Sequence, residues 1–163
     1  MTQDPTGATP QDHACLTKVL ALARRSRDQG HHPFAAMVVA ADGSVIAEAM
    51  NASSCDRTAH AEMNALRLAS QRHSPAELAT ATLYSNAEPC AMCAGGTYWS
   101  GVGRVVYAMS EQSLLALTGS DAENPTLSLP CRQVFAAGQR RTEVIGPLRE
   151  DEARAAHAGF WHN

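Results

Sequence analysis

The sequence lacks a long hydrophobic run. Its longest uninterrupted apolar stretch, residues 34–41, is much shorter than the roughly 20 residues that a helix needs to cross a bilayer. The first ten residues, MTQDPTGATP, contain neither a basic patch nor an apolar segment, so they do not resemble a secretory signal. We therefore expect no membrane-spanning segment and predict a cytoplasmic location.

An excess of positive charge is also absent. The chain has 13 Lys and Arg against 16 Asp and Glu, which gives a net charge of −3. Proteins that bind phosphate backbones usually carry at least one basic face. A nucleic-acid partner is therefore not expected.

The number of cysteines is odd. There are five of them in 163 residues, and no export signal accompanies them. This pattern favours reduced thiols with metal-binding or catalytic use over a disulfide framework. The cysteines are Cys15, Cys55, Cys90, Cys93 and Cys131.

The length suits one domain, and helical and strand patterns alternate along it. Apolar residues between Leu16 and Ala23 recur at the spacing of one helical stripe, and Asp42-Gly43 between two apolar runs is a hairpin signal. Alternation of this kind indicates α/β layers with parallel strand pairs after an opening hairpin. The predicted helices cover residues 12–29, 58–72, 90–99, 111–117 and 150–157, and the predicted strands cover 34–41, 44–51, 81–85, 103–108 and 142–145, with a flexible tail over 1–11 and a loop over 118–131.

Two short segments carry chemistry: His-Ala-Glu at residues 60–62 and Pro-Cys-Ala-Met-Cys at residues 89–93. Taken alone, the Cys-x-x-Cys pair fits a metal site or a thioredoxin-like redox pair, and a lone His-x-Glu means little. Together, at two predicted helix starts, they indicate a zinc site. One imidazole and two thiolates are good zinc ligands, and they leave the fourth tetrahedral position open for water.

The spacing of His60 and Glu62 limits where such a site can lie. Residues at i and i+2 point apart on the flank of a helix, so these two converge only in its first turn. Thr58 as the helix cap would place them there. Glu62 would then reach the water position without binding the metal.

The combination of His-x-Glu with Pro-Cys-x-x-Cys resembles the signature of the cytidine deaminase-like superfamily of zinc enzymes. The resemblance runs from residue 30 to residue 108. It includes Pro-Phe-Ala-Ala at 33–36, Asn51, Thr-Ala-His-Ala-Glu at 58–62 and Glu-Pro-Cys-Ala-Met-Cys-Ala-Gly at 88–95. Thr-Tyr-Trp at 97–99 and the aromatic C-terminal tail are similar to small guanine deaminases.

This resemblance implies a three-layer α/β/α sandwich with a mixed five-stranded sheet, in a single domain over residues 12–163 with a C-terminal tail at about 158–163. It also implies a homodimer and one Zn²⁺ per chain, bound by His60, Cys90 and Cys93. The implied reaction is hydrolytic deamination, in which Glu62 moves protons between water, the substrate ring and the departing ammonia.

The same resemblance suggests substrate contacts. Asn51 would hydrogen-bond the substrate ring, and the backbone amide of Ala61 would meet the attacked ring or its new oxygen. Phe34 is either a core residue or a stacking partner for the base. Asp121 either recognises purine nitrogens or forms a turn in its loop.

Phe160 and Trp161 would close the site, in their own subunit or in a partner's, or else pack onto their own helices. The first functional hypothesis is a zinc-dependent aminohydrolase of a small free base, guanine-like first, with cytosine, pterin or aminotriazine as alternatives. The second is a tRNA adenosine deaminase. The third is a non-catalytic zinc module.

Overall fold

A five-stranded sheet forms the centre of the structure, a computed structural model that describes residues 4–162. The strand order is β2-β1-β3-β4-β5. Strand β1 pairs antiparallel with β2 and β3, whereas β3, β4 and β5 run parallel. The strands are β1 (Ala35–Val39), β2 (Val45–Met50), β3 (Thr82–Ala87), β4 (Arg104–Met109) and β5 (Glu143–Ile145).

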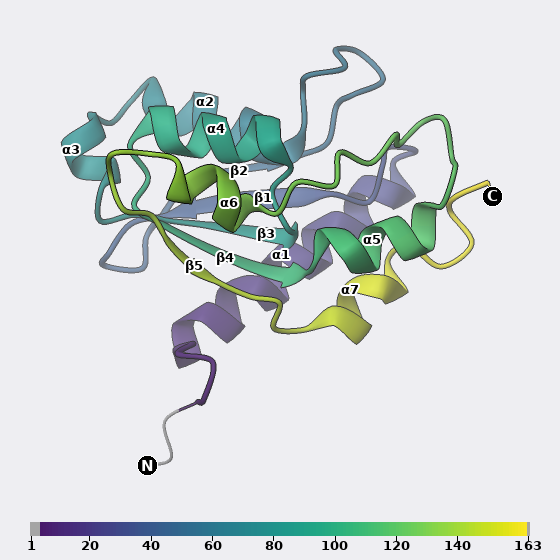
Figure 1. Cartoon of the computed structure of the whole chain (residues 1–163), viewed down its shortest axis with the longest axis horizontal. Helices are drawn as coiled ribbons and strands as arrows, with labels where there is room; N and C mark the ends of the chain where they lie inside the picture. Colours follow the sequence, from purple (N-terminus) through teal and green to yellow (C-terminus); the bar gives the residue numbers. More distant parts are fainter. Residues whose placement is uncertain (1–3, 163) are drawn as a thin grey trace.

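Helices cover both faces of this sheet (Figure 1). The predicted three-layer sandwich with a mixed sheet is confirmed. One layer contains α2 (Ala61–Ser70), α3 (Pro75–Leu78), α4 (Ala91–Ser100) and α6 (Cys131–Ala136), and the other contains α1 (Pro10–Asp28), α5 (Glu111–Thr118) and α7 (Glu150–Ala155). None of the helices within residues 4–162 combines the length and apolar character needed to span a bilayer.

Each face of the sheet has its own hydrophobic core. Because side chains alternate along a strand, Met37 packs toward α1 while its neighbour Val38 packs toward α2. Every residue of β1 is therefore buried. Such two-sided burial produces the continuous apolar run seen in the sequence.

Several boundaries differ from those predicted. Helix α1 begins at Pro10 rather than residue 12, because Thr9 and Asp12 form a reciprocal capping box. The tail expected over residues 1–11 is therefore shorter; its residues 1–3 lie outside the described range. Two short helices were not predicted: α3, which Ser74 caps, and α6, which starts within the expected 118–131 loop.

A buried ion pair ties α1 to the sheet. Asp12 is 1% exposed, and its carboxylate accepts two hydrogen bonds from Arg104, at 2.7 and 2.8 Å, and one from the Tyr84 hydroxyl at 2.7 Å. Burial alone would raise the pKa of Asp12. The hydrogen bonds from Arg104 and from the Thr9 amide outweigh burial and hold this pKa below its usual range.

We predict that Asp12→Asn lowers the free energy of unfolding by about 2–4 kcal/mol, because Arg104 would lose its buried counter-charge. Urea denaturation at pH 7 measures this change. Glu143→Gln is the matched control, since Glu143 is half exposed and contacts the same guanidinium group. Its effect should stay within about 0.5 kcal/mol, as for other surface pairs. Equal losses in the two variants would contradict the argument.

Candidate metal centre and active site

Helices α2 and α4 begin side by side on one face of the sheet (Figure 1). His60 is the N-cap residue of α2, and Cys90 is the N-cap residue of α4. Cys93 lies one turn into α4. The expected cap, Thr58, is wrong: both its amide and its hydroxyl bind the Asp56 carboxylate instead.

The three expected metal ligands meet at these helix starts. The His60 Nδ1 atom lies 3.6 Å from the Sγ atoms of both Cys90 and Cys93. Zinc–sulfur bonds of about 2.3 Å and zinc–nitrogen bonds of about 2.05 Å at a tetrahedral angle require an S···N separation of about 3.6 Å. The donor set therefore fits zinc. Within residues 4–162, no other group of three His, Cys, Asp or Glu side chains is arranged to hold a metal.

The two cysteine thiols of the cluster differ in acidity. Hydrogen bonds from Cys93 and then from His60 lower the pKa of Cys90 to about 4, against the opposing effect of burial. The hydrogen bond to Cys90 and burial raise the pKa of Cys93. Zinc requires both sulfurs as thiolates, so metal binding is expected to release a proton.

Glu62 lies beside this cluster, in the first turn of α2. It is 6% exposed; its Oε1 atom accepts from the Ser85 hydroxyl at 3.0 Å, and its Oε2 atom accepts from Cys93 Sγ at 3.6 Å. Burial raises the pKa of Glu62. The structure thus brings His60 and Glu62 together over the helix end, as their spacing requires. The role of Glu62 in proton transfer stays a prediction.

A cavity of about 710 Å³ opens over the cluster. His60, Cys90 and Glu62 line it at one end, and residues 122–127 of the long loop form another wall. This volume suits a small heterocyclic ligand.

Asn51 and Phe34 also line the cavity. The Oδ1 atom of Asn51 accepts from the amide and hydroxyl of Ser53, at 2.9 and 2.7 Å. A backbone N–H can only donate, so this contact fixes which way the amide points. Its Nδ2 atom has no hydrogen-bond partner among residues 4–162 and is free to donate to a ligand. Ala61 is fully buried at the first position of α2, and it does not line the cavity.

The C-terminal tail packs against its own chain. The rings of Phe160 and Trp161 lie 5.7 and 5.0 Å from the His32 ring, and Trp161 also contacts Phe34 and His157. Neither tail aromatic lines the cavity, but His32 and Phe34 do. The tail therefore supports the cavity wall from behind.

Asp121 does not reach the cavity. Its carboxylate accepts from the amide of Glu123 at 2.9 Å and from the amide of His162 at 2.7 Å, so it joins the long loop to the tail. The expected contact of Asp121 with purine nitrogens stays a prediction. The acid of this loop that lines the cavity is Glu123, whose Oε2 lies 3.1 Å from His32 Nε2. The two acids are two residues apart, and nothing in the sequence distinguishes their roles.

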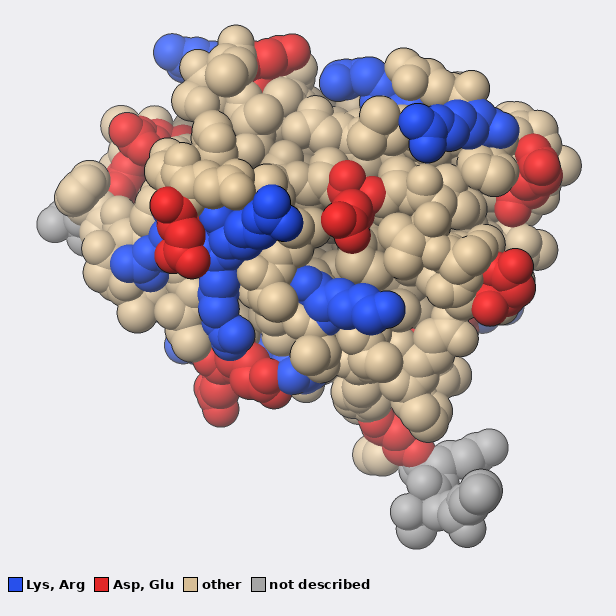
Figure 2. Space-filling model, turned by 180° about the vertical axis from the view of Figure 1, so that it is seen from behind, with Lys and Arg blue, Asp and Glu red and all other residues tan. Residues whose placement is uncertain are grey.

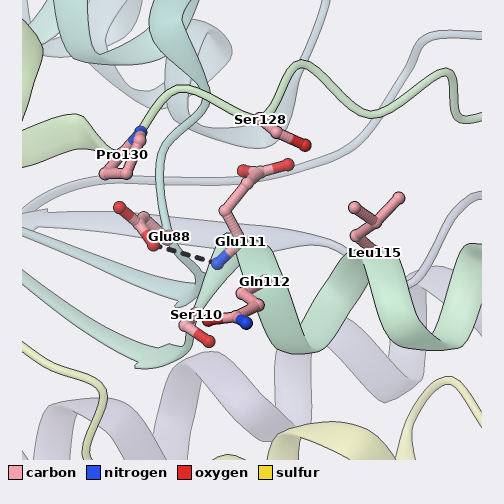
Figure 3. A pocket seen from close by; sticks show the side chains of 7 residues that line it. All are labelled: Glu88, Ser110, Glu111, Gln112, Leu115, Ser128 and Pro130. Atoms are coloured by element: carbon pink, nitrogen blue, oxygen red, sulfur yellow. Dashed lines mark hydrogen bonds between the residues drawn. The ribbon is translucent and has the colours of Figure 1, made fainter.

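Two further acids were not predicted as site residues. Glu88, within the Glu-Pro-Cys segment, accepts from the amides of Cys131 and Glu111 at 2.8 and 2.9 Å and so holds the starts of α6 and α5. Figure 3 shows the bond from the Glu111 amide. Glu111 is buried and lines the cavity. Burial raises the pKa of Glu111 to about 8, and the nearby charge of Cys90 adds to this shift.

Residues 9–109 match the family model described as the cytidine and deoxycytidylate deaminase zinc-binding region. The chain belongs to this family. It is 37% identical over 157 residues to a probable cytosine deaminase of Schizosaccharomyces pombe, with 96% of each protein covered. It is 35% identical to a tRNA-specific adenosine deaminase of Haemophilus influenzae, over 61% of this chain and 59% of the relative.

A solved structure of guanine deaminase from Nitrosomonas europaea has the same fold. The TM-score is 0.70 at 31% identity, and the match covers 92% of this chain and 83% of the other. The expected superfamily and its zinc-binding deaminase domain are thus confirmed.

We predict that Cys90→Ser loses most of its zinc, because a hydroxyl is a poor replacement for a thiolate ligand. Metal analysis of the purified protein should find about one zinc per chain in the wild type and far less in the variant. Cys55→Ser is the control: this thiol is exposed at the cavity but lies outside the ligand set, and zinc should be retained. Full occupancy in Cys90→Ser would refute the ligand assignment.

Proposed function

We propose that the protein is a zinc-dependent aminohydrolase that releases ammonia from a small free heterocyclic base, with guanine as the first candidate. One observation carries the proposal. A buried carboxyl group, Glu62, accepts a hydrogen bond from Ser85 beside three zinc-type ligands, at the end of a cavity that can hold a heterocyclic base. A structural zinc site needs neither the acid nor the cavity.

The residues around the cluster would have separate roles in the reaction. Zinc bound by His60, Cys90 and Cys93 supplies a Lewis acid that makes water acidic enough to react at neutral pH. Glu62 would take the water's proton and give it to the ring nitrogen, and would then take the proton of the newly added hydroxyl and give it to the leaving amine, which departs as ammonia. The Ser85 hydroxyl orients the carboxylate for both transfers.

Other side chains would bind the ring. The Nδ2 atom of Asn51 donates a hydrogen bond to a ring carbonyl or ring nitrogen. The backbone amide of Ala61, at the start of α2 beside His60, would meet the attacked ring or its new oxygen. Phe34, which precedes β1 and lines the cavity, would stack on the base. Glu123, which lines the cavity, accepts a hydrogen bond from a ring N–H.

Guanine is favoured because an acid of the long loop, Glu123, lines the cavity, where it can accept hydrogen bonds from ring N–H groups. Similarity to the solved guanine deaminase over 92% of the chain supports the same choice. Cytosine is the second candidate, since the relative that the chain matches over 96% of its length is named a probable cytosine deaminase. Pterin and aminotriazine rings share the amine-bearing ring carbon.

A tRNA substrate is disfavoured on charge, although a tRNA-specific relative matches part of the chain. Arg57 is the one Lys or Arg among the described residues that line the cavity. On the face opposite that of Figure 1, positive and negative side chains are interspersed (Figure 2). A phosphate backbone would find no continuous basic surface there.

We also propose a homodimer. Trp99 on α4 is 84% exposed, and an aromatic side chain of this kind favours contact with another subunit. Exchange of the C-terminal segment between subunits remains a prediction, as does the cytoplasmic location.

The decisive experiment measures ammonia release by the zinc-loaded protein from guanine, cytosine, pterin, an aminotriazine and a tRNA anticodon stem-loop. We expect the highest kcat/KM for guanine and no deaminated tRNA. A higher value for cytosine would replace guanine as the substrate. Failure to act on any free base would overturn the proposed function.

We predict that Glu62→Gln keeps zinc and fold but lowers kcat at least a hundredfold, because the amide cannot shuttle a proton. Steady-state kinetics on the best base, with zinc content and circular dichroism measured in parallel, checks this. Glu48→Gln, an exposed change on β2 away from the cavity, is the control and should keep wild-type kinetics. A Glu62→Gln rate within tenfold of wild type would mean that another group moves the proton.

A further inference from the structure

Four acidic side chains near the active-site cavity are almost completely buried. Their exposed fractions lie between 6% and 8%. Burial of a carboxyl group without hydrogen-bond partners is unfavourable, so each of them requires an explanation. They are Glu62, Glu88, Glu111 and Asp121.

Three of the four have donors within the protein. Glu62 accepts from a serine hydroxyl, while Glu88 and Asp121 each accept from two backbone amides. Glu111 differs from them. Its backbone amide donates to Glu88, but its own carboxyl group has no hydrogen bond or ion pair with any of residues 4–162.

The carboxyl group of Glu111 faces open space. It extends from the first residue of α5 toward the segment that holds Ser128, away from Gln112 (Figure 3). Glu111 lines both the 710 Å³ cavity above the zinc ligands and an adjoining cavity of about 240 Å³. No Lys or Arg among the described residues lines the smaller cavity. A ligand in these cavities that carries an N–H can supply the missing hydrogen bond to this carboxyl group.

We propose that Glu111 is a specificity-determining residue that accepts a hydrogen bond from a ring N–H of the substrate base. This inference rests on the proposed function and extends it. A free base carries a ring N–H where a nucleoside carries its glycosidic bond. A buried acceptor at this wall would therefore select free bases over their nucleosides. A site built to pair with an N–H strongly rejects analogues that lack it.

The test uses two variants of the zinc-loaded protein, Glu111→Gln and Glu111→Leu. The first keeps an acceptor oxygen, and the second removes it. We expect kcat/KM on the best free base to fall at least tenfold in Glu111→Leu and less in Glu111→Gln, mainly through KM. Gln112→Ala is the matched control, because Gln112 is exposed and lines only the smaller cavity, not the cavity above the zinc ligands.

Singly N-methylated forms of that base then locate the contact. One of them should be a poor substrate for the wild type. On this form, Glu111→Leu should cause no further fall in kcat/KM, because methylation has already removed the same hydrogen bond. An equal loss on every methylated form would overturn the proposal. A larger loss on the nucleoside than on the base would overturn it too, since the contact would then be to a sugar hydroxyl.

Thermal unfolding separates this role from a structural one. Since the Glu111 carboxyl has no protein partner, Glu111→Leu should keep zinc and unfold at the same or a higher temperature than the wild type. A lower unfolding temperature with loss of zinc would show a structural role.

Calorimetric binding of guanine to wild type and Glu111→Leu needs no turnover, so it tests the contact even if deamination fails. Equal dissociation constants would overturn the inference.

Discussion

The site depends on two helices that begin at the same point on one face of the sheet. N-cap positions normally hold Ser, Thr, Asp or Asn, whose side chains satisfy free amides of the first turn. Here they hold His60 and Cys90, and neither side chain makes a capping hydrogen bond. Both helices give up that stabilisation in order to present metal ligands. Zinc binding is thus expected to stabilise the folded conformation of the first turns of α2 and α4.

The buried acids form a second layer around this point. Glu88 links the starts of α5 and α6 through two backbone amides, so the chain that leaves the sheet after β4 is fixed beside the α4 start. This connection positions both Glu111 and the loop that follows α5. The Glu-Pro-Cys segment therefore joins a structural acid to a metal ligand within three residues. The segment therefore serves packing as well as metal binding.

The metal centre could be predicted because its ligands come from two short segments whose chemistry is specific. Details that depend on competing local hydrogen bonds could not. Thr58 resembled a helix cap, but its amide and hydroxyl both donate to the Asp56 carboxylate, and His60 is the N-cap residue. The roles of Asp121 and Glu123 depend on where the C-terminal backbone passes, which no local pattern encodes. Glu111 was predicted only as a helix residue, since its isolation from partners is a tertiary property.

The hydrogen bond from the His162 amide to Asp121 has a practical consequence for handling the protein. It joins the C-terminal segment to the loop that walls the cavity, so a displacement of one segment is expected to displace the other. An affinity tag fused to the C-terminus would load this connection and disturb the wall. The start of α1 lies at the other end of the molecule (Figure 1), which makes the N-terminal side the safer place for a fusion.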